Sequence, residues 1–519
     1  MRDATQPQSE PTAPPEHLAA ENAELRAQVA SLTRQLEWFK RQVFGPTSER
    51  RSVDAATVDL FTAEQAPATA SPTTEQVSYS RRKPGTKDRG DAVTGAGLRF
   101  DAGVPVETID VAAPELSGTE AHRWEVIDHK TTYRLAQRPG SYVVLAYRRP
   151  VLRERSGATV VTPPAPAGVL EGSLADVSVL AGLVVDKFCY HLPLYRQHQR
   201  LADAGIQVSR ATLTHLTQRT AALLTPINDA QHAHILEGDV LAMDETPIKA
   251  GRNKAKGRMA QGWYWPIYGE ADEVSFTYAS HRGTRHVHEQ LQGFAGTLLS
   301  DGYSAYARFA EATEGLTHAQ CWAHTRRKFL AAEGAEPETV ATALEHIRGL
   351  YRIEAAIRDR RLEPDKALAF RAEHARPRVD AFFAWVWEQR QREDLLPSNP
   401  LAKALAYAHE REGPLRVFLG DAAVPIDTNH LERALRVIPM GRKNWNFCWT
   451  ELGARHVGTL QSLLTTCRLQ GVNPHTYLVD VLQRISRHPA RDIIALTPRV
   501  WKERFAHDPL TSDVERHAC

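Results

Sequence analysis

A short apolar run that ends in two carboxylates constrains the fold of this chain more than any other stretch. Residues 238–249 read Gly-Asp-Val-Leu-Ala-Met-Asp-Glu-Thr-Pro-Ile-Lys, so the run stops at Asp244 and Glu245. An apolar run between turn signals predicts a buried strand, although periodicity alone also allows a helix. A carboxylate at the end of a buried strand needs a partner, and a divalent metal ion is one such partner. Capping of the next element is the alternative role for either carboxylate.

A second acidic strand end and a third acidic position downstream favour the metal over the cap. Residues 296–303 repeat the pattern, with an apolar run that ends at Asp301, and Glu432 follows in a predicted helix. From residue 240 to residue 329 the patterns predict three strands, a helix, a strand, a helix, a strand and a helix, if residues 304–312 are helical. This order matches the ribonuclease-H-like plan, where the first and fourth strands each bring an aspartate to the centre of the sheet.

The charge distribution indicates a protein that binds a polyanion. The net charge is only +2 and charged residues make up 24% of the chain, so the total charge alone points to no partner. Basic residues nevertheless cluster at residues 81–83, 148–149, 252–258, 326–328 and 433–443. One such cluster is typical of a solvated surface, whereas five clusters interleaved with carboxylate-bearing segments fit a protein that grips a polyanion and holds metal.

Cysteine usage and hydropathy predict a cytoplasmic, nucleoid-associated protein without a membrane partner. The five cysteines are scattered and odd in number, which favours a reducing compartment over a disulfide framework. No stretch has the length and apolarity of a membrane-spanning helix, and the N-terminus lacks the apolar core of a signal peptide.

The first 95 residues predict a coiled coil between two segments without regular structure. Residues 1–15 are rich in Pro, Gln and Thr, which predicts disorder. Within residues 16–45 two series recur every seven residues, namely Leu18, Leu25, Leu32 and Phe39 with Asn22, Val29, Leu36 and Val43. These heptads predict a short coiled coil that makes the protein a homo-oligomer, and an amphipathic helix packed on its own body is the alternative. Residues 46–95 show little periodicity, so we interpret them as a linker.

Two segments precede the candidate site. Residues 96–168 contain β-like runs, which predict a small β module, at residues 124–127, 131–134 and 141–147. Residues 169–235 are helical in period and include two helices joined by a turn at Gly205, with Ser209 as the N-cap of the second helix. A DNA-reading helix-turn-helix fits this pattern, and so does an ordinary helical hairpin, which is the more common structure.

The rest of the chain predicts an α/β core in two parts. The first part of the core spans residues 236–332, and an all-helical insertion follows at residues 333–412. The second part of the core spans residues 413–474, and a C-terminal helical segment with a tail spans residues 475–519. In the second part, Thr428 or Asn429 can cap the helix that carries Glu432. Residues 444–449 predict an extended or β-like aromatic stretch.

Seven stretches in a fixed order carry a family resemblance. They are Leu192-Pro-Leu-Tyr-Arg-Gln, Asp244-Glu-Thr-Pro, Asp301-Gly-Tyr-Ser-Ala-Tyr, Cys321-Trp-Ala-His-Thr-Arg-Arg-Lys-Phe, Asp427-Thr-Asn-His-Leu-Glu-Arg, Arg442-Lys-Asn-Trp and Gly471-Val-Asn-Pro. With them the sequence resembles the transposase family of insertion sequence 66, a DDE-type bacterial family. The resemblance covers about residues 16–50 and 165–490.

The resemblance implies a DNA transposase with a metal-dependent catalytic triad. Its catalytic and metal-binding residues would be Asp244, Asp301 and Glu432, in a ribonuclease-H-like core that a helical insertion interrupts before the glutamate. Two Mg²⁺ or Mn²⁺ ions would be held, with Asp244 on both, Asp301 on one and Glu432 on the other.

The same resemblance implies DNA, and companion proteins encoded by the same element, as partners. Basic side chains that could hold the DNA backbone are Arg326, Arg327, Lys328, Arg433, Arg436, Arg442 and Lys443.

The sequence departs from the family in its cysteines, so no zinc is expected. Members carry paired Cys-x-x-Cys motifs between the zipper and the catalytic domain, whereas residues 46–188 contain no cysteine. His318, Cys321 and His324 have metal-like spacing but no evident fourth ligand. Glu245 is not expected to bind metal either, because successive side chains on a strand point to opposite faces.

Two alternatives to an active transposase stay open at this stage. One is a non-catalytic DNA-binding or assembly protein of transposon descent, and the other is a ribonuclease-H-like nuclease without strand transfer. The intact acidic positions favour the transposase.

Overall fold

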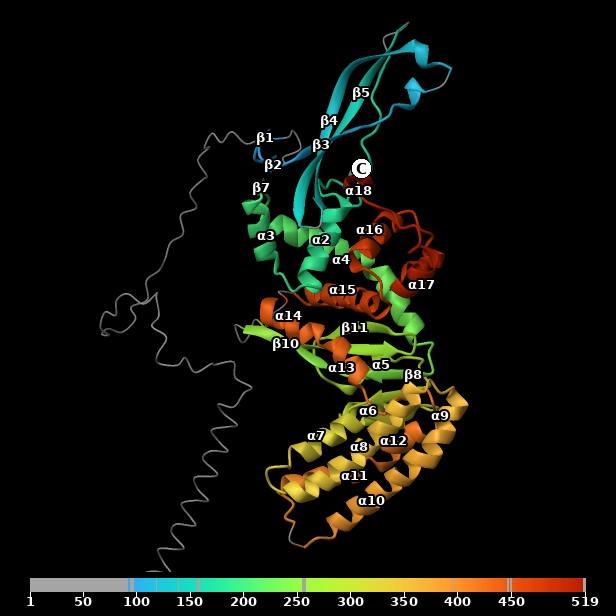
Figure 1. Cartoon of the computed structure of the whole chain (residues 1–519). Coiled ribbons are helices and arrows are strands. Elements are labelled where there is room, and N and C mark those ends of the chain that lie inside the picture. The colour runs from blue at the N-terminus through green and yellow to red at the C-terminus, as the bar shows by residue number, and fades with distance from the viewer. Residues whose placement is uncertain are drawn as a thin grey trace, which may run out of the picture. The chain divides into compact units, whose positions relative to one another are not determined.

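The computed structural model describes residues 92–93 and 98–516, except residues 118, 139, 156–158, 254–257, 394, 446–447 and 449. The chain divides into two compact units, Met1–Thr86 and Lys87–Cys519. The expected disordered segment at 1–15, the coiled coil at 16–45 and nearly all of the 46–95 linker lie outside the described residues. All of the structure below belongs to the second unit (Figure 1).

A mixed sheet of six strands forms the centre of this unit. Its order is β11-β10-β8-β12-β13, and β9 pairs with β10 beside that path. The strands are β8 (Val240–Met243), β9 (Thr246–Asn253), β10 (Arg258–Gly269), β11 (Glu273–Ala279), β12 (Thr297–Ser300) and β13 (Thr317–Gln320). Strands β8, β12 and β13 run parallel, and β10 is antiparallel to β8, β9 and β11. All four β8 residues are buried, which confirms the predicted strand and excludes the helix.

Helices cover both faces of the sheet because the buried strand residues alternate between two apolar clusters. Leu241 and Met243 belong to one cluster, together with residues of α5 (Thr284–Gln290) and α6 (Ser304–Ala312). Val240 and Ala242 belong to the other, which includes α4 (Arg210–Ile235) and α15 (Glu451–Leu469). A strand buried on both faces must be apolar throughout, as β8 is. Figure 1 shows α15 beside β11.

One strand was missing from the prediction. The sequence patterns gave three strands before the first helix, whereas the structure has four, since β9 follows β8 directly. Thr246, Ile248 and Ala250 are buried and the residues between them are exposed, which is the alternation of a half-buried strand. Pro247 concealed this alternation, and the proline is tolerated because β9 lies off the main path of the sheet and pairs with β10 alone among the named strands.

The predicted insertion is helical and lies between α7 (Trp322–Leu330) and α13 (Asn429–Leu435) in the sequence. Its helices are α8 (Pro337–Asp359), α9 (Pro364–Phe370), α10 (Arg376–Arg390), α11 (Pro400–His409) and α12 (Glu412–Arg416). Trp322 of α7 joins the insertion to the core, because its ring contacts Phe382, Phe383 and Phe418. Its indole nitrogen donates to the Leu415 carbonyl at 2.9 Å.

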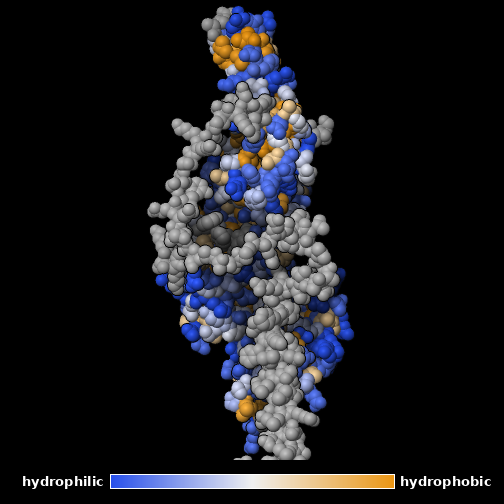
Figure 2. Space-filling model, turned by 90° about the vertical axis from the view of Figure 1, so that its left-hand side faces the viewer, coloured by the Kyte–Doolittle hydropathy of each residue, from blue (hydrophilic) through white to orange (hydrophobic). Residues whose placement is uncertain are grey.

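Residues 106–161 form a β arm. Strands β3 (Val106–Asp110), β4 (Trp124–Arg138), β5 (Ser141–Glu154) and β6 (Val160–Val161) make one sheet, so the runs predicted at 124–127 and 131–134 belong to a single strand. Val126, Ile127 and Val160 are 45%, 45% and 53% exposed. Figure 2 shows hydrophobic surface gathered at the end of this arm.

Helices between the arm and the central sheet complete the unit. They are α2 (Val177–Phe188), α3 (Leu194–Asp203), α4, α16 (Pro474–Arg484), α17 (Pro498–Arg504) and α18 (Asp513–Arg516). The expected cap of α4 is confirmed, since the Ser209 hydroxyl accepts from the Thr212 amide at 3.0 Å. Strand β7 (Ile206–Gln207), between α3 and α4, pairs with β2 (Arg99–Phe100), and β1 (Ala92–Val93) pairs with β2 in turn. Among the helices of residues 98–516, none is both long and apolar enough to cross a membrane.

The stretch predicted as extended at residues 444–449 begins in a helix. Helix α14 (Val437–Trp445) includes Asn444, and Cys448 makes an isolated β-bridge with Ala250. The Asn444 side chain donates to the Met440 carbonyl at 3.2 Å, and Arg442 donates to the Pro247 carbonyl. The bond within α14 and the tertiary contact of Arg442 with β9 together outweigh the weak helix propensity of Asn and Trp.

Candidate active site

Two of the predicted acidic residues are neighbours at the centre of the sheet. Strand β8 pairs in parallel with β12, and Val240 lies opposite Thr297, an offset of 57 residues (297 − 240). Asp244 and Asp301 are separated by the same number (301 − 244), and each follows the last residue of its strand. Adjacent strands lie about 4.8 Å apart, so this register brings the two aspartates to the same edge of the sheet side by side.

Each of these aspartates has one carboxylate oxygen engaged and one free for a ligand. Oδ1 of Asp244 accepts from the Glu245 amide at 2.7 Å, and Oδ1 of Asp301 accepts from the Tyr303 amide at 2.8 Å. Among the described residues, no hydrogen bond reaches Oδ2 of either side chain. The backbone bonds fix the two carboxyl groups without using all of their acceptor capacity.

Glu432 comes to the site through contacts between α7 and the segment before α13. The Trp322 amide donates to the Ile426 carbonyl at 3.1 Å, and the Thr428 amide and hydroxyl both lie 3.3 Å from Cys321 Sγ. Thr428 therefore does not cap α13 with its side chain, contrary to one prediction. Asp427 does this instead, because its Oδ1 accepts from the Asn429 amide at 2.9 Å.

The Glu432 carboxylate is held by an ion pair rather than by the aspartates. Arg327 of α7 donates to both of its oxygens, and His324 Nε2 lies 3.7 Å from Oε1. Within residues 98–516, no three His, Cys, Asp or Glu side chains are placed as ligands of one metal ion. The structure therefore brings Asp244 and Asp301 together and leaves Glu432 nearby on Arg327.

Burial and neighbouring carboxylates disfavour ionisation of Asp244. Burial and the charges of Glu245, Asp301 and Glu432 raise the pKa of Asp244 to about 7. Close like charges disfavour ionisation, and a bound cation relieves such a cluster. Burial and the Arg327 charge lower the pKa of His324, while Asp301 and Glu432 act in the opposite direction.

The histidines and the cysteine with metal-like spacing are occupied by other contacts. His318 Nε2 lies 2.9 Å from the Ser300 hydroxyl, and His324 Nε2 lies 3.1 Å from an Arg327 nitrogen. Cys321 accepts from Thr428 as described above. His324 was not predicted as a residue of the active site. Only the fold places it near Asp301 and Glu432.

Glu245 ties the ends of the two acidic strands together. Its side chain is buried, forms an ion pair with Arg282 and accepts from the Tyr306 hydroxyl at 2.6 Å. Tyr306 lies in α6, which follows Asp301 directly, so this bond links the residue after Asp244 to the helix after Asp301. Arg282 also stacks on the Tyr303 ring, with 3.8 Å between its guanidinium carbon and the ring centre. Tyr306 closes the stretch Asp301-Gly-Tyr-Ser-Ala-Tyr that carries the family resemblance, whereas no sequence pattern pointed to Arg282.

Replacing Tyr306 with Phe should destabilise the protein by about 1–3 kcal/mol, because the buried Glu245 carboxylate loses a hydrogen-bond donor. Tyr303→Phe is the matched control, since its hydroxyl lies 3.5 Å from the Arg282 carbonyl at an exposed position and should matter by less than about 0.5 kcal/mol. Urea denaturation of both variants measures the difference. Equal stabilities would contradict this role of Tyr306.

The helical insertion packs against the loop that carries Asp301. A Cβ atom on Gly302 would lie 2.4 Å from the Tyr407 hydroxyl, so only glycine permits this close approach. Arg411 stacks on the Tyr407 ring at 3.9 Å and donates to the Gly302 carbonyl at 3.4 Å. The Lys328 ammonium group also lies over the Tyr407 ring, 5.1 Å from the ring centre. The insertion thereby supports the site from the side of α11.

The basic residues predicted to bind DNA differ in how exposed their side chains are. Arg326, Arg327 and Lys328 are exposed on α7, as are Arg433 and Arg436 on and after α13 and Lys443 on α14. Arg442 is only half-buried and donates to the Pro247 carbonyl, and burial lowers its pKa. Arg442 therefore has a structural role in holding α14 on β9, in addition to its predicted role in DNA binding.

Comparisons with known proteins agree on one family. Residues 172–456 match the family model described as the transposase family of IS66, and residues 462–499 match the IS66 C-terminal element. Residues 31–109 match a model described as transposase C of IS166 homeodomain. The uncharacterized protein y4hP of Sinorhizobium fredii is 28% identical over 92% of this chain and 90% of its own length. The uncharacterized protein y4qI of the same organism is 32% identical over 76% of this chain and 75% of its own length.

Proposed function

Because this chain belongs to the IS66 transposase family, we propose that it is a DDE-type enzyme that cleaves DNA at transposon ends and joins those ends to target DNA. The observation that carries the proposal is the register of β8 and β12, which places Asp244 beside Asp301. The proposed catalytic residues are Asp244, Asp301 and Glu432.

The order of the sheet supports a ribonuclease-H-like core. Strands β11, β10 and β8 are successive antiparallel neighbours in the sheet, and β12 and β13 continue the sheet in parallel beyond β8. The first strand is therefore central, and the next parallel strand lies beside it. This is the arrangement in which two strand-end carboxylates can meet at one point.

The donor set fits magnesium or manganese, which prefer oxygen ligands from one or two carboxylates. Such ions, when bound as a pair, activate the attacking hydroxyl and stabilise the leaving oxygen of a phosphodiester. Oδ2 of Asp244 and Oδ2 of Asp301 are the available ligand atoms. Glu432 would join them when its carboxylate exchanges the Arg327 guanidinium for the metal.

The remaining groups around the site would position DNA. Arg326 and Lys328 project from α7, and Arg433 and Arg436 lie on and just after α13, the helix that carries Glu432. There they can contact phosphate groups without reading the sequence. His324, with its lowered pKa, is neutral near neutral pH and accepts a hydrogen bond from Arg327. It thus holds Arg327 in place rather than adding a charge.

A strand-transfer assay with pre-cut transposon ends, target DNA and Mg²⁺ tests this function. Joined products show the proposed transposase. Cleavage without joining would indicate a nuclease, and DNA binding without either reaction would indicate the non-catalytic assembly protein. The ion pair between Glu432 and Arg327 is the observation that favours this last alternative, because it holds the glutamate on an arginine rather than on the aspartates.

Deletion of residues 1–45 should lower the number of subunits in the particle. The heptad series in residues 16–45 would place an apolar seam between two or more helices, and Asn22 within that seam would fix their register. Size-exclusion chromatography with light scattering gives the mass of the full chain and of the deletion variant. An unchanged subunit number would remove the coiled coil from the proposal.

A further inference from the structure

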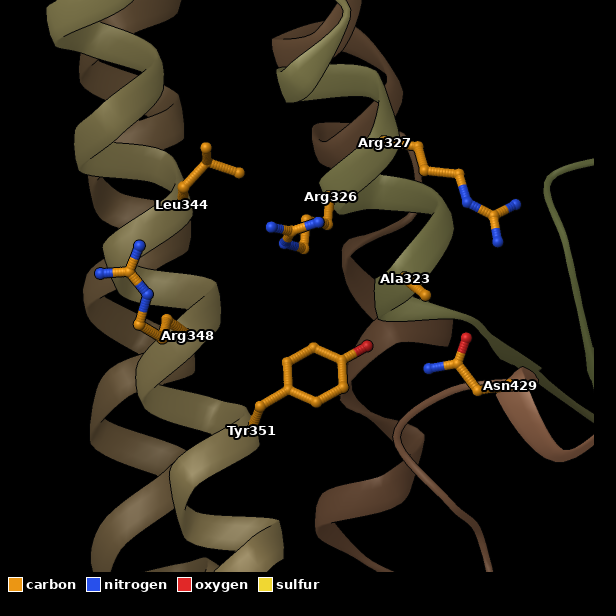
Figure 3. Close-up of a pocket in the computed structure, with 7 residues that line it drawn as sticks. All are labelled: Ala323, Arg326, Arg327, Leu344, Arg348, Tyr351 and Asn429. Carbon is orange, nitrogen blue, oxygen red and sulfur yellow. The ribbon is translucent and has the colours of Figure 1, made fainter.

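A cavity of about 360 Å³ lies between the insertion and the helix that carries Arg327. Its walls are Ala323, Arg326 and Arg327 of α7, Leu344, Arg348 and Tyr351 of α8, and Asn429 of α13. Figure 3 shows the Arg326 side chain directed toward α8, which carries Arg348, and the Tyr351 hydroxyl directed to the space between Ala323 and Asn429. Burial and the nearby Asp427 carboxylate raise the pKa of Tyr351, so this hydroxyl stays protonated and able to donate.

A second cavity of about 520 Å³ continues the first along α8. Tyr351 and Asn429 line both, and the second adds Arg358 of α8 and Arg433 of α13. The α8 residues from Leu344 to Arg358 that line the two cavities span 14 positions (358 − 344), or about 21 Å along the helix axis. The two cavities adjoin at Tyr351 and Asn429, and together we name them the basic groove, defined by Arg326, Arg327, Arg348, Tyr351, Arg358 and Arg433.

The charge of the basic groove is positive after its internal pairs are considered. Five arginines line it, against the carboxylates of Glu354 and Asp427. Glu354 is already paired with the buried Arg371 at 2.8 Å, and Asp427 accepts two hydrogen bonds from Asn429. An excess of cations remains for a ligand.

The arginines of the groove can turn to a ligand at little cost. Arg348 pairs with Glu345 and Arg358 with Asp359, but both partners in each pair are more than half exposed. Exposed pairs of this kind contribute about 0–1 kcal/mol. Among the described residues, Arg326 and Arg433 make neither a side-chain hydrogen bond nor an ion pair.

We propose that the basic groove binds the phosphate backbone of a DNA strand that enters the active site, with Arg348 and Arg358 as phosphate-binding residues contributed by the insertion. This inference rests on the proposed function and gives the insertion a direct role in holding substrate. Arginine matches phosphate oxygens with paired donors, and a length of about 21 Å suits a chain of phosphates rather than one small anion. Arg327 lines the groove and also pairs with Glu432, so the groove begins at the proposed catalytic residues.

The test is a binding measurement with a fluorescently labelled DNA duplex of mixed sequence, at several salt concentrations, with Ca²⁺ and without Mg²⁺. Phosphate contacts are independent of sequence, so the terminal repeats are not needed. Arg348→Gln/Arg358→Gln should weaken binding about tenfold and lower the slope of log Kd against log salt by about 2, since each lost phosphate contact contributes about 0.9. Each single replacement should give about half of the change in slope.

Arg352→Gln is the matched control, because Arg352 lies on the same helix, is exposed and lines neither cavity. Its affinity and salt slope should equal those of the unchanged protein. Thermal unfolding of all variants checks that the exposed replacements leave the fold intact. If R348Q/R358Q bound DNA like the control, the inference would be wrong. Strand transfer by the unchanged protein is scored separately, so failure of the groove and failure of the proposed transposase are distinguishable.

Discussion

Replacing Asp244, Asp301 or Glu432 with its isosteric amide should lower DNA cleavage and strand transfer by several orders of magnitude. The amide keeps the shape of each side chain but removes the charge that would hold a divalent metal, and that metal supplies much of the transition-state stabilisation. The backbone bonds at Oδ1 of the two aspartates can persist in Asp244→Asn and Asp301→Asn, so folding should survive. DNA binding in Ca²⁺ should also survive. Assays with pre-cut ends and Mg²⁺ measure both reactions.

Asp427→Asn is the control for these variants. Asp427 is a buried carboxylate five residues before Glu432, and its hydrogen bonds to Asn429 assign it to the cap of α13. An asparagine keeps the acceptor oxygen, so most of the activity should remain. Loss of activity in Asp427→Asn together with normal activity in Glu432→Gln would show that the third carboxylate has been assigned to the wrong residue.

Replacing Trp322 with Ala should destabilise the protein by about 3–5 kcal/mol, because Trp322 is fully buried and its loss leaves a large cavity. The ring contacts Phe382, Phe383 and Phe418, and the indole donates to the Leu415 carbonyl. The cavity would separate the insertion from α7 and disturb the position of Arg327. Denaturant unfolding followed by circular dichroism measures the loss.

Trp387→Ala is the corresponding control in the insertion. Trp387 is 58% exposed on α10, and its loss should change the stability by less than about 0.5 kcal/mol. A comparable loss in both variants would mean that Trp322 does not join the two parts of the chain. A Trp322→Phe variant, which keeps an aromatic ring, should fall between them.

The local parts of this architecture could be predicted from the sequence. Helix α6 has the predicted bounds, β12 stops just before Asp301 as predicted, and β8 is the buried strand that its apolar run indicated. In these elements the hydrophobic pattern agrees with the tertiary environment, so the pattern alone was sufficient. The pattern failed at β9, where Pro247 interrupts it, and at α14, where contacts to β9 stabilise a helix that its residues do not favour.

The parts that could not be predicted depend on contacts between distant residues. Arg327 and Glu432 are 105 residues apart, and Glu245 and Tyr306 are 61 apart. The basic groove is formed by α7, α8 and α13 together. Of its arginines, only Arg326, Arg327 and Arg433 lie in the basic clusters that are visible in the sequence. Arg348 and Arg358 lie in a helix with many charges, where no periodicity separates a binding arginine from a solvated one.

The position of the insertion also determines when the site can exist. Glu432 follows Asp301 by 131 residues (432 − 301), and most of that interval is the insertion. During synthesis β8 and β12 leave the ribosome before the insertion, and α13 can pack on α7 only after the whole insertion has been synthesised. A nascent or prematurely terminated chain would hold two of the proposed carboxylates without the third. On the proposed assignment, such incomplete chains could not cut the DNA of the cell that makes them.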